Sequence, residues 1–95
     1  MKRVTIGKFY ATVERAAHEY DLFKMNNQFM ITKCNPKNMQ IEVLDGTAVR
    51  FIGMRDERDW NQVAGFEFCY VESYDLDAAS QLFIMSRVRG GWKND

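Results

Sequence analysis

The stretch that decides the fold runs from Asp45 to Gly91 and reads DGTAVRFIGMRDERDWNQVAGFEFCYVESYDLDAASQLFIMSRVRGG. It begins with Asp45-Gly46, a pair typical of tight hairpin turns, because a two-residue type I′ turn needs the positive φ that these residues adopt easily. Thr47–Met54 follows as a short β-type run, and Phe66–Val71 is a second apolar run that ends at Glu72. An amphipathic segment comes next. The stretch therefore predicts two strands followed by a helix.

Upstream of this stretch, the pattern predicts two further strands. Phe29–Cys34 is rich in apolar and β-branched residues, and Asn35–Asn38 has the proline and asparagine of a turn. Apolar and polar residues alternate from Met39 to Val43, as in a half-buried strand. We therefore expect a three-stranded antiparallel meander from Phe29 to Met54, with Phe66–Val71 as a further, buried central strand.

The N-terminal region carries apolar residues at helical spacing. They recur at intervals of three and four on one face, with charged residues between them: Ile6, Phe9, Tyr10, Val13, Ala16, Ala17 and Tyr20. This pattern predicts a helix from about Ile6 to Phe23, with Thr5 as its N-cap.

A second helix is expected at the C-terminal end. Ser73 or Asp75 supplies an N-cap, and the apolar side continues to about Val88. Gly90-Gly91 ends the helix, and Trp92–Asp95 forms a short tail. The fold class is therefore α+β in one domain, residues 1–95, with an N-terminal helix, an antiparallel β-meander plus a further central strand, and a C-terminal helix.

Composition excludes several classes of protein. The 95 residues include 13 basic and 13 acidic side chains, so no global field draws the chain to nucleic acid or to an anionic membrane. No apolar run approaches the roughly 20 residues of a membrane span, and the N-terminus has no apolar core typical of a signal peptide. Two cysteines without a secretory signal indicate free thiols in a reducing compartment, and a single histidine argues against a structural metal.

The order of motifs in the opening stretch resembles the middle of the ATPase domain of phage terminase large subunits, the motors that package viral DNA. In that family a strand with the pattern gs-x-I-x-F-x-G precedes the Walker B strand, and an Arg-x-Arg motif closes the following helix. The positions that match are Gly46, Phe51, Ile52, Gly53, Gly65, Glu72, Arg87 and Arg89. The resemblance implies a strand that delivers Glu72 to the rim of a sheet, where motor proteins hold a metal-coordinating carboxylate.

The parts of the motor that carry out chemistry are missing. The phosphate loop pattern G-x-x-x-x-G-K-[ST] is absent, since the only Gly-Lys pair, Gly7-Lys8, is followed by Phe9. The Val71-Glu72-Ser73 sequence offers one carboxylate where the family needs two. We therefore expect no ATP hydrolysis, no catalytic residue, no metal and no cofactor.

Binding surfaces are the remaining candidates, and two of opposite charge are compatible with the sequence. The acids Glu72, Asp75 and Asp77 would form a negative strip for a basic partner. A basic surface for nucleic acid would instead combine four arginines with an interleaved tryptophan: Arg55, Arg58, Arg87, Arg89 and Trp60. The simplest alternative is that these are solvated charges neutralised by neighbouring acids.

Three functions follow from these features. The first is a small non-catalytic phage-derived protein that acts in the host cytoplasm by binding a protein, with a host defence nuclease complex of the CRISPR type as the target. This target follows from the phage resemblance alone. The second is a truncated or split terminase segment that serves DNA packaging, and the third is a nucleic-acid-binding module. The binder should be a compact domain or a closed homodimer, whereas the motor segment should expose apolar sheet edges.

Overall fold

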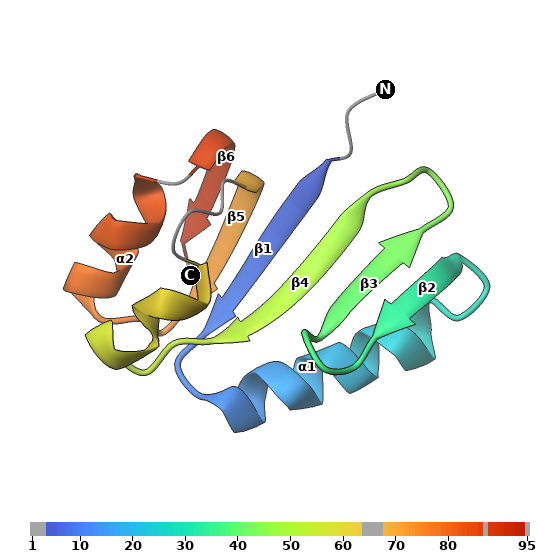
Figure 1. Cartoon of the computed structure of the whole chain (residues 1–95), viewed down its shortest axis with the longest axis horizontal. Coiled ribbons are helices and arrows are strands. Elements are labelled where there is room, and N and C mark those ends of the chain that lie inside the picture. The colour runs from blue at the N-terminus through green and yellow to red at the C-terminus, as the bar shows by residue number, and fades with distance from the viewer. Residues whose placement is uncertain (1–3, 64–67, 87, 95) are drawn as a thin grey trace.

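The computed structural model describes residues 4–63 and 68–86, and the backbone of residues 88–94. Its elements follow one another as β1 (Thr5–Tyr10), α1 (Val13–Asn26), β2 (Ile31–Asn35), β3 (Gln40–Val43), β4 (Ala48–Gly53), the 3₁₀ helix η1 (Glu57–Val63), β5 (Phe68–Tyr74), α2 (Ala78–Met85) and β6 (Val88–Asn94). Figure 1 shows a single twisted sheet with helices on both of its faces.

The six strands form one mixed sheet in the order β2-β3-β4-β1-β5-β6. Strands β2, β3 and β4 are antiparallel neighbours, which confirms the predicted meander. Strand β1 then pairs in parallel with both β4 and β5, and β5 pairs in parallel with β6. The strand β5 is therefore internal to the sheet, as the apolar run before Glu72 predicts.

Helix α1 packs on one face of the sheet, over β4 and β1. Its buried residues Ala16 and Tyr20 join a cluster with Tyr10, Ile41 and Phe51 from three strands. Aromatic contacts dominate this cluster: the Tyr20 and Phe51 rings meet edge to face with centroids 5.9 Å apart. Burial of this apolar face holds α1 on the sheet, since short helices are stabilised mainly by packing.

Helix α2 and η1 cover the opposite face. Phe9 and Phe68 meet edge to face at 5.5 Å, in a buried cluster that includes Val63 from η1 and Ile84 from α2. Alternate residues of β1 thus enter different cores: Phe9 points toward α2, and Tyr10 points toward α1.

The covering helices change from one face of the sheet to the other between β1 and β5. Strands β1 and β5 are parallel neighbours, but the helix after β1 covers one face and the helix after β5 covers the other. In open sheets of parallel strands, ligands bind outside the carboxyl ends of the strands where the chain changes direction in this way. Figure 1 shows the carboxyl ends of β1, β4 and β5 meeting beside η1 and the starts of α1 and α2. We call this side of the molecule the carboxyl edge.

The N-terminal prediction is wrong in its first half. The residues from Thr5 to Tyr10 form a central strand, and the helix begins only at Val13, with Thr12 as its N-cap. The hydroxyl of Thr12 accepts a hydrogen bond from the Arg15 amide at 3.0 Å. A helix starting at Ile6 would place Phe9 and Tyr10 on one side, whereas the strand divides them between two separate cores.

The C-terminal prediction needs three corrections, although the α+β class and the C-terminal helix are confirmed. The N-cap of α2 is Asp77, whose carboxylate accepts a hydrogen bond from the Ser80 amide at 3.2 Å. The helix ends at Met85, before the predicted Val88. The expected tail from Trp92 lies in β6, which begins at Val88 and adds an edge strand in parallel with β5.

Candidate binding site at the carboxyl edge

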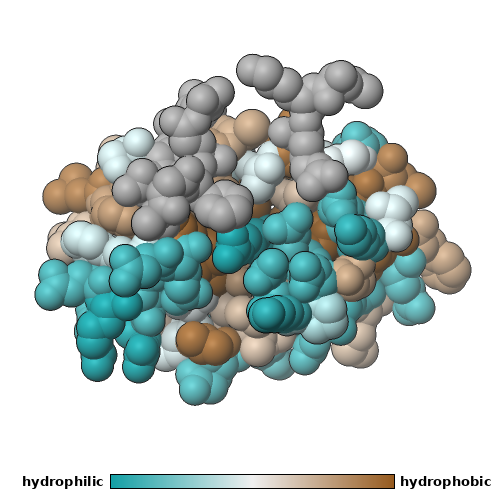
Figure 2. Space-filling view, viewed as in Figure 1, coloured by the Kyte–Doolittle hydropathy of each residue, from teal (hydrophilic) through white to brown (hydrophobic). Residues whose placement is uncertain are grey.

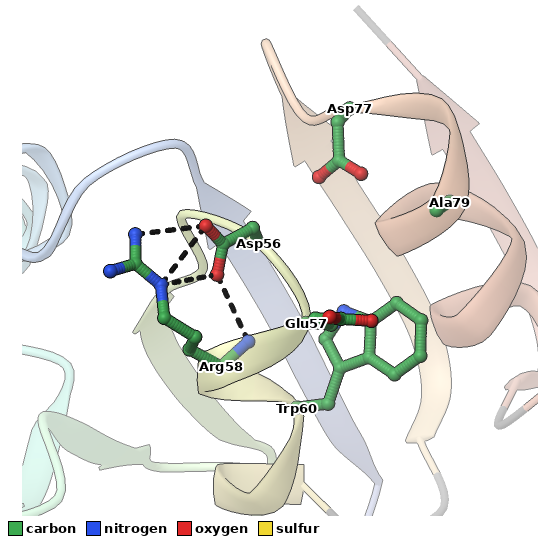
Figure 3. Close-up of a pocket in the computed structure, with 6 residues that line it drawn as sticks. All are labelled: Asp56, Glu57, Arg58, Trp60, Asp77 and Ala79. Atoms are coloured by element: carbon green, nitrogen blue, oxygen red, sulfur yellow. Dashed lines mark hydrogen bonds and ion pairs between the residues drawn. The ribbon is translucent and has the colours of Figure 1, made fainter.

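An open pocket lies at the carboxyl edge, between η1 and the start of α2. Its volume is about 300 Å³, and its lining residues are Asp56, Glu57, Arg58, Trp60, Asp77 and Ala79. Three of the residues singled out from the sequence, Arg58, Trp60 and Asp77, therefore line the same pocket. Figure 3 shows Asp77 and Ala79 on the α2 side, facing Asp56 and the start of η1, which carries the other three.

The charged segment before Trp60, Arg55–Asp59, contains two internal ion pairs. The Arg58 side chain contacts the carboxylate of Asp56, with 2.8 Å between Nη2 and Oδ2. The guanidinium of Arg55 donates two hydrogen bonds to the Asp59 carboxylate, at 3.0 and 3.1 Å. Two of the four arginines of the predicted basic surface, Arg55 and Arg58, thus already form ion pairs with neighbouring acids.

These ion pairs change the acidity of the carboxyl groups. Hydrogen bonds from the side chain and amide of Arg58 lower the pKa of Asp56 from its usual 3.8 to about 2. Hydrogen bonds from Arg55 lower the pKa of Asp59 in the same direction. Both carboxylates are therefore fully charged at neutral pH.

Trp60 forms the apolar wall of the pocket and ties η1 to α2. Its indole stacks on the Phe83 ring at 4.5 Å, with an interplanar angle of 11°. Its Nε1–H donates a hydrogen bond to the Oγ of Ser80, which is completely buried, at 3.0 Å. These contacts fix the ring in place before any ligand binds, so binding would not have to order this side chain.

The two aspartates of the predicted negative strip lie at the end of β5. Asp75 is exposed and adopts the left-handed conformation with φ of 60°, which turns the chain from the strand toward α2. Asp77 is exposed, and its hydrogen bonds with Ser80 lower the pKa of its carboxyl group. Capping leaves this carboxylate charged and facing the pocket.

Glu72 lies away from the pocket. Strand β5 continues to Tyr74, so Glu72 is inside the strand and not at its end. Its carboxylate accepts a hydrogen bond from the Tyr74 hydroxyl and lies 4.0 Å from Nζ of Lys8, the residue beside it on β1. Glu72 thus takes part in contacts across the face of the sheet, and it is not brought together with Asp75 and Asp77.

The arginines of the predicted basic surface could share one surface only if the C-terminal helix packed beside the strand that begins after Gly46. In the structure β1 separates β4 from β5, and α2 contacts η1 and β6. Arg50 of β4 is half-buried on the α2-side face, and desolvation lowers its pKa. Arg87 lies outside the described residues, as does the side chain of Arg89, so neither is placed relative to Arg55 and Arg58.

The pocket has an acidic character. It combines three carboxylates with one guanidinium, and that guanidinium is paired with Asp56. In Figure 2 hydrophilic side chains gather over η1 and the start of α2, at the lower left. Sequence reasoning treated Asp56 and Glu57 as neutralising charges and missed that they line a pocket. The run of charged residues from Arg55 to Asp59 was the feature of the sequence that could have indicated these two lining residues.

A second exposed surface is apolar and lies at the opposite edge of the sheet. Four large side chains are exposed where α1 ends and where β3 turns into β4: Met25, Phe29, Met30 and Leu44. Phe29 is 94% exposed, and the Leu44 amide donates to the Met30 carbonyl at 2.9 Å, which holds the two segments together.

Among residues 4–63 and 68–86, no group of three or more His, Cys, Asp or Glu side chains has an arrangement that could hold a metal ion. No helix within the described part of the chain is both long and apolar enough to cross a membrane.

Comparisons with protein-family models, with curated proteins and with solved structures give no match to this chain.

Proposed function

We propose that this chain is a non-catalytic binding protein whose carboxyl edge receives a basic segment of a partner protein. The observation that carries the proposal is the pocket between η1 and α2, with three carboxylates against one guanidinium already in an ion pair. A lysine or arginine entering this pocket would meet the carboxylates of Glu57 and Asp77. Its aliphatic stem would pack against Trp60, as cationic side chains commonly do on indole rings.

The acidic balance favours a basic protein over nucleic acid. Arg55 and Arg58 would have to leave Asp59 and Asp56 before they could contact phosphate groups. The surrounding carboxylates, including the exposed Asp75, would repel a phosphate backbone. A terminase segment serving DNA packaging is a weaker alternative, because Glu72 lies inside β5 with Lys8 and Tyr74 as its partners.

The terminase-like residues bear on the identity of the partner. If the chain derives from a phage motor, the basic surface of a host defence nuclease complex is a target of the right chemistry, since such complexes bind nucleic acid through positive charge. An inhibitor with an acidic edge would occupy that surface in the host cytoplasm.

A direct test uses a fluorescently labelled octalysine peptide and a labelled DNA duplex as probes, with binding followed by anisotropy at low salt. The variant Glu57→Gln/Asp77→Asn removes two charges from the pocket, and asparagine at position 77 keeps the N-cap. The control is Asp45→Asn, an exposed acid in the β3–β4 turn at the opposite edge, where asparagine retains the hydrogen bond from the Thr47 amide.

We expect the wild type and Asp45→Asn to bind octalysine equally, and the double variant to bind at least tenfold more weakly. Equal binding by all three proteins would place the peptide elsewhere and overturn the proposal. Preferential binding of the duplex by the wild type would favour the nucleic-acid module instead.

In a capture experiment from infected host lysate, a defence nuclease retained by the wild type and lost by the double variant would support a role as an inhibitor. Capture of portal or small terminase subunit would favour the packaging role.

A further inference from the structure

The exposed apolar side chains at the sheet edge away from the pocket form one group, which we call the apolar surface. Its members are Met25, Phe29, Met30 and Leu44. In Figure 2 hydrophobic side chains line the right-hand end of the molecule, where Figure 1 shows the β3–β4 turn and the start of β2. Single exposed apolar residues are normal on a protein, whereas a contiguous group of large ones marks an interaction site.

Hydrogen bonds hold down both ends of the segment that joins α1 to β2. The Asn27 amide donates to the Phe23 carbonyl at 3.1 Å, and the Met30 amide donates to the Asn27 carbonyl at 2.8 Å. The Leu44 amide donates to the Met30 carbonyl at 2.9 Å, which ties the β3–β4 turn to the same segment. The Phe29 ring is therefore presented by a backbone that a partner would not have to order first.

The open edge of β2 lies beside the apolar surface but is poorly suited to receive another strand. β2 is the outermost strand at this side of the sheet, and its pairing with β3 shifts register between Ile31 and Lys33. The side chain of Lys33 is exposed. Bulges and lysines on an edge strand hinder the addition of a further strand. A partner would therefore pack against the apolar side chains and would not extend the sheet.

Charges of opposite sign flank the apolar surface. Lys24 precedes Met25 at one end, and the exposed Asp45 follows Leu44 at the other. In a twofold dimer the same patch serves both subunits, so the Lys24 end of one copy would meet the Asp45 end of its partner, and the reverse. The chain has 13 basic and 13 acidic residues, so two copies approach without net repulsion. The apolar surface is thus complementary to itself.

The size of the apolar surface suits a weak dimer. Phe29 is 94% exposed, Leu44 69%, Met25 68% and Met30 50%. Together these side chains offer roughly 500 Å² of apolar area per copy. Two copies would bury about 1,000 Å² from them alone, and a polar rim brings the total toward the roughly 1,200 Å² at the lower end of stable interfaces.

We propose that this chain forms a homodimer about a twofold axis, in which the apolar surface of one copy packs on that of the other. Phe29 is the central contact, and Lys24 and Asp45 at the rim fix the orientation of the two copies. The pocket at the carboxyl edge lies at the other side of each copy, so the dimer presents two pockets that face outward. The dimer does not depend on what these pockets bind.

The experiment is sedimentation velocity on the whole chain, from about 1 to 500 μM, a range that covers the affinity expected for so small an interface. The variants are Phe29→Ser and Leu44→Ser. The matched control is Leu82→Ser, since Leu82 on α2 is 68% exposed and Leu44 is 69% exposed. Because all three side chains point into solvent in a single copy, the variants should keep the wild-type circular dichroism spectrum.

We expect a wild-type dimer with a Kd of about 10–100 μM. Phe29→Ser should raise the Kd at least about tenfold, Leu44→Ser should raise it about three- to tenfold, and Leu82→Ser should leave it unchanged. A wild-type protein that stays monomeric at the highest concentration would overturn the proposal. So would an equal loss in Leu82→Ser and Leu44→Ser. Binding of a monomeric wild type to phosphatidylcholine vesicles, lost in Phe29→Ser, would assign the surface to lipid instead.

Discussion

Replacing Gly53 by alanine is the sharpest test of how β4 meets α1. A Cβ at position 53 would lie 2.4 Å from the Cα of Val13, 2.5 Å from its amide nitrogen and 2.7 Å from the carbonyl carbon of Thr12. All three atoms belong to the backbone at the start of α1, so no side-chain rotation relieves the contact. The substitution therefore forces α1 away from the end of the strand.

The expected cost exceeds that of ordinary overpacking, which is about 1–3 kcal/mol. We predict a loss of at least about 3 kcal/mol from a total unfolding free energy of about 5–15 kcal/mol. For a domain of this size that corresponds to a fall in Tm of about 12 °C or more. Urea denaturation followed by tryptophan fluorescence, together with thermal melts, measures both quantities.

The matched control is Gly46→Ala, since a Cβ there meets no atom within 4 Å. Its cost comes only from the positive φ of 90°, and should be about 1–2 kcal/mol. A loss at Gly53 that is smaller than the loss at Gly46 would refute the close approach of β4 and α1.

Three further predictions concern single side chains. Thr12→Ala should destabilise the protein by about 1 kcal/mol in urea melts because the Arg15 amide loses its cap, whereas Thr12→Ser should restore most of the loss. Arg58→Gln should raise the pKa of Asp56 from about 2 toward 3.8 in an NMR titration of carboxyl carbons. Because folding lowers this pKa, the ion pair stabilises the protein above about pH 4, and this contribution is lost as the pH falls toward 2. If the free energy of unfolding fell with acid in the same way in Arg58→Gln and in the wild type, this assignment would be contradicted. Tyr20→Phe should leave stability unchanged or raise it by up to about 1 kcal/mol, because it removes a buried hydroxyl that has no hydrogen-bond partner among the described residues; a clear destabilisation in thermal melts would show that this hydroxyl is satisfied.

Local chemistry in the sequence determined the meander and the C-terminal helix. The Asp45-Gly46 pair correctly marked the hairpin between β3 and β4, although only Gly46 has positive φ, so the connection is not the two-residue type I′ turn that the sequence predicted. Alternation from Met39 to Val43 and the apolar run before Glu72 carried enough information to place β3 and β5. These signals act between neighbours in the chain, which is why they could be read without the fold.

Tertiary structure decided whether Thr5–Tyr10 is a helix or a strand. The apolar residues there fit both periods, and pairing with β4 on one side and β5 on the other selects the strand. A separate pairing with β5 makes β6 a strand, where the sequence suggested a tail. Backbone partners that are 20 or more positions away in the chain leave no mark on local spacing.

The candidate site, too, was determined partly by the sequence and partly by the tertiary structure. The sequence singled out Arg58, Trp60 and Asp77 as binding residues, and the structure assembles them into one pocket because β5 lies on the far side of β1 from β4. It separated Glu72 from them because β5 continues two residues past it. Residue type supplied the candidate chemistry, while the crossing of the chain at the carboxyl edge determined which charges share a surface.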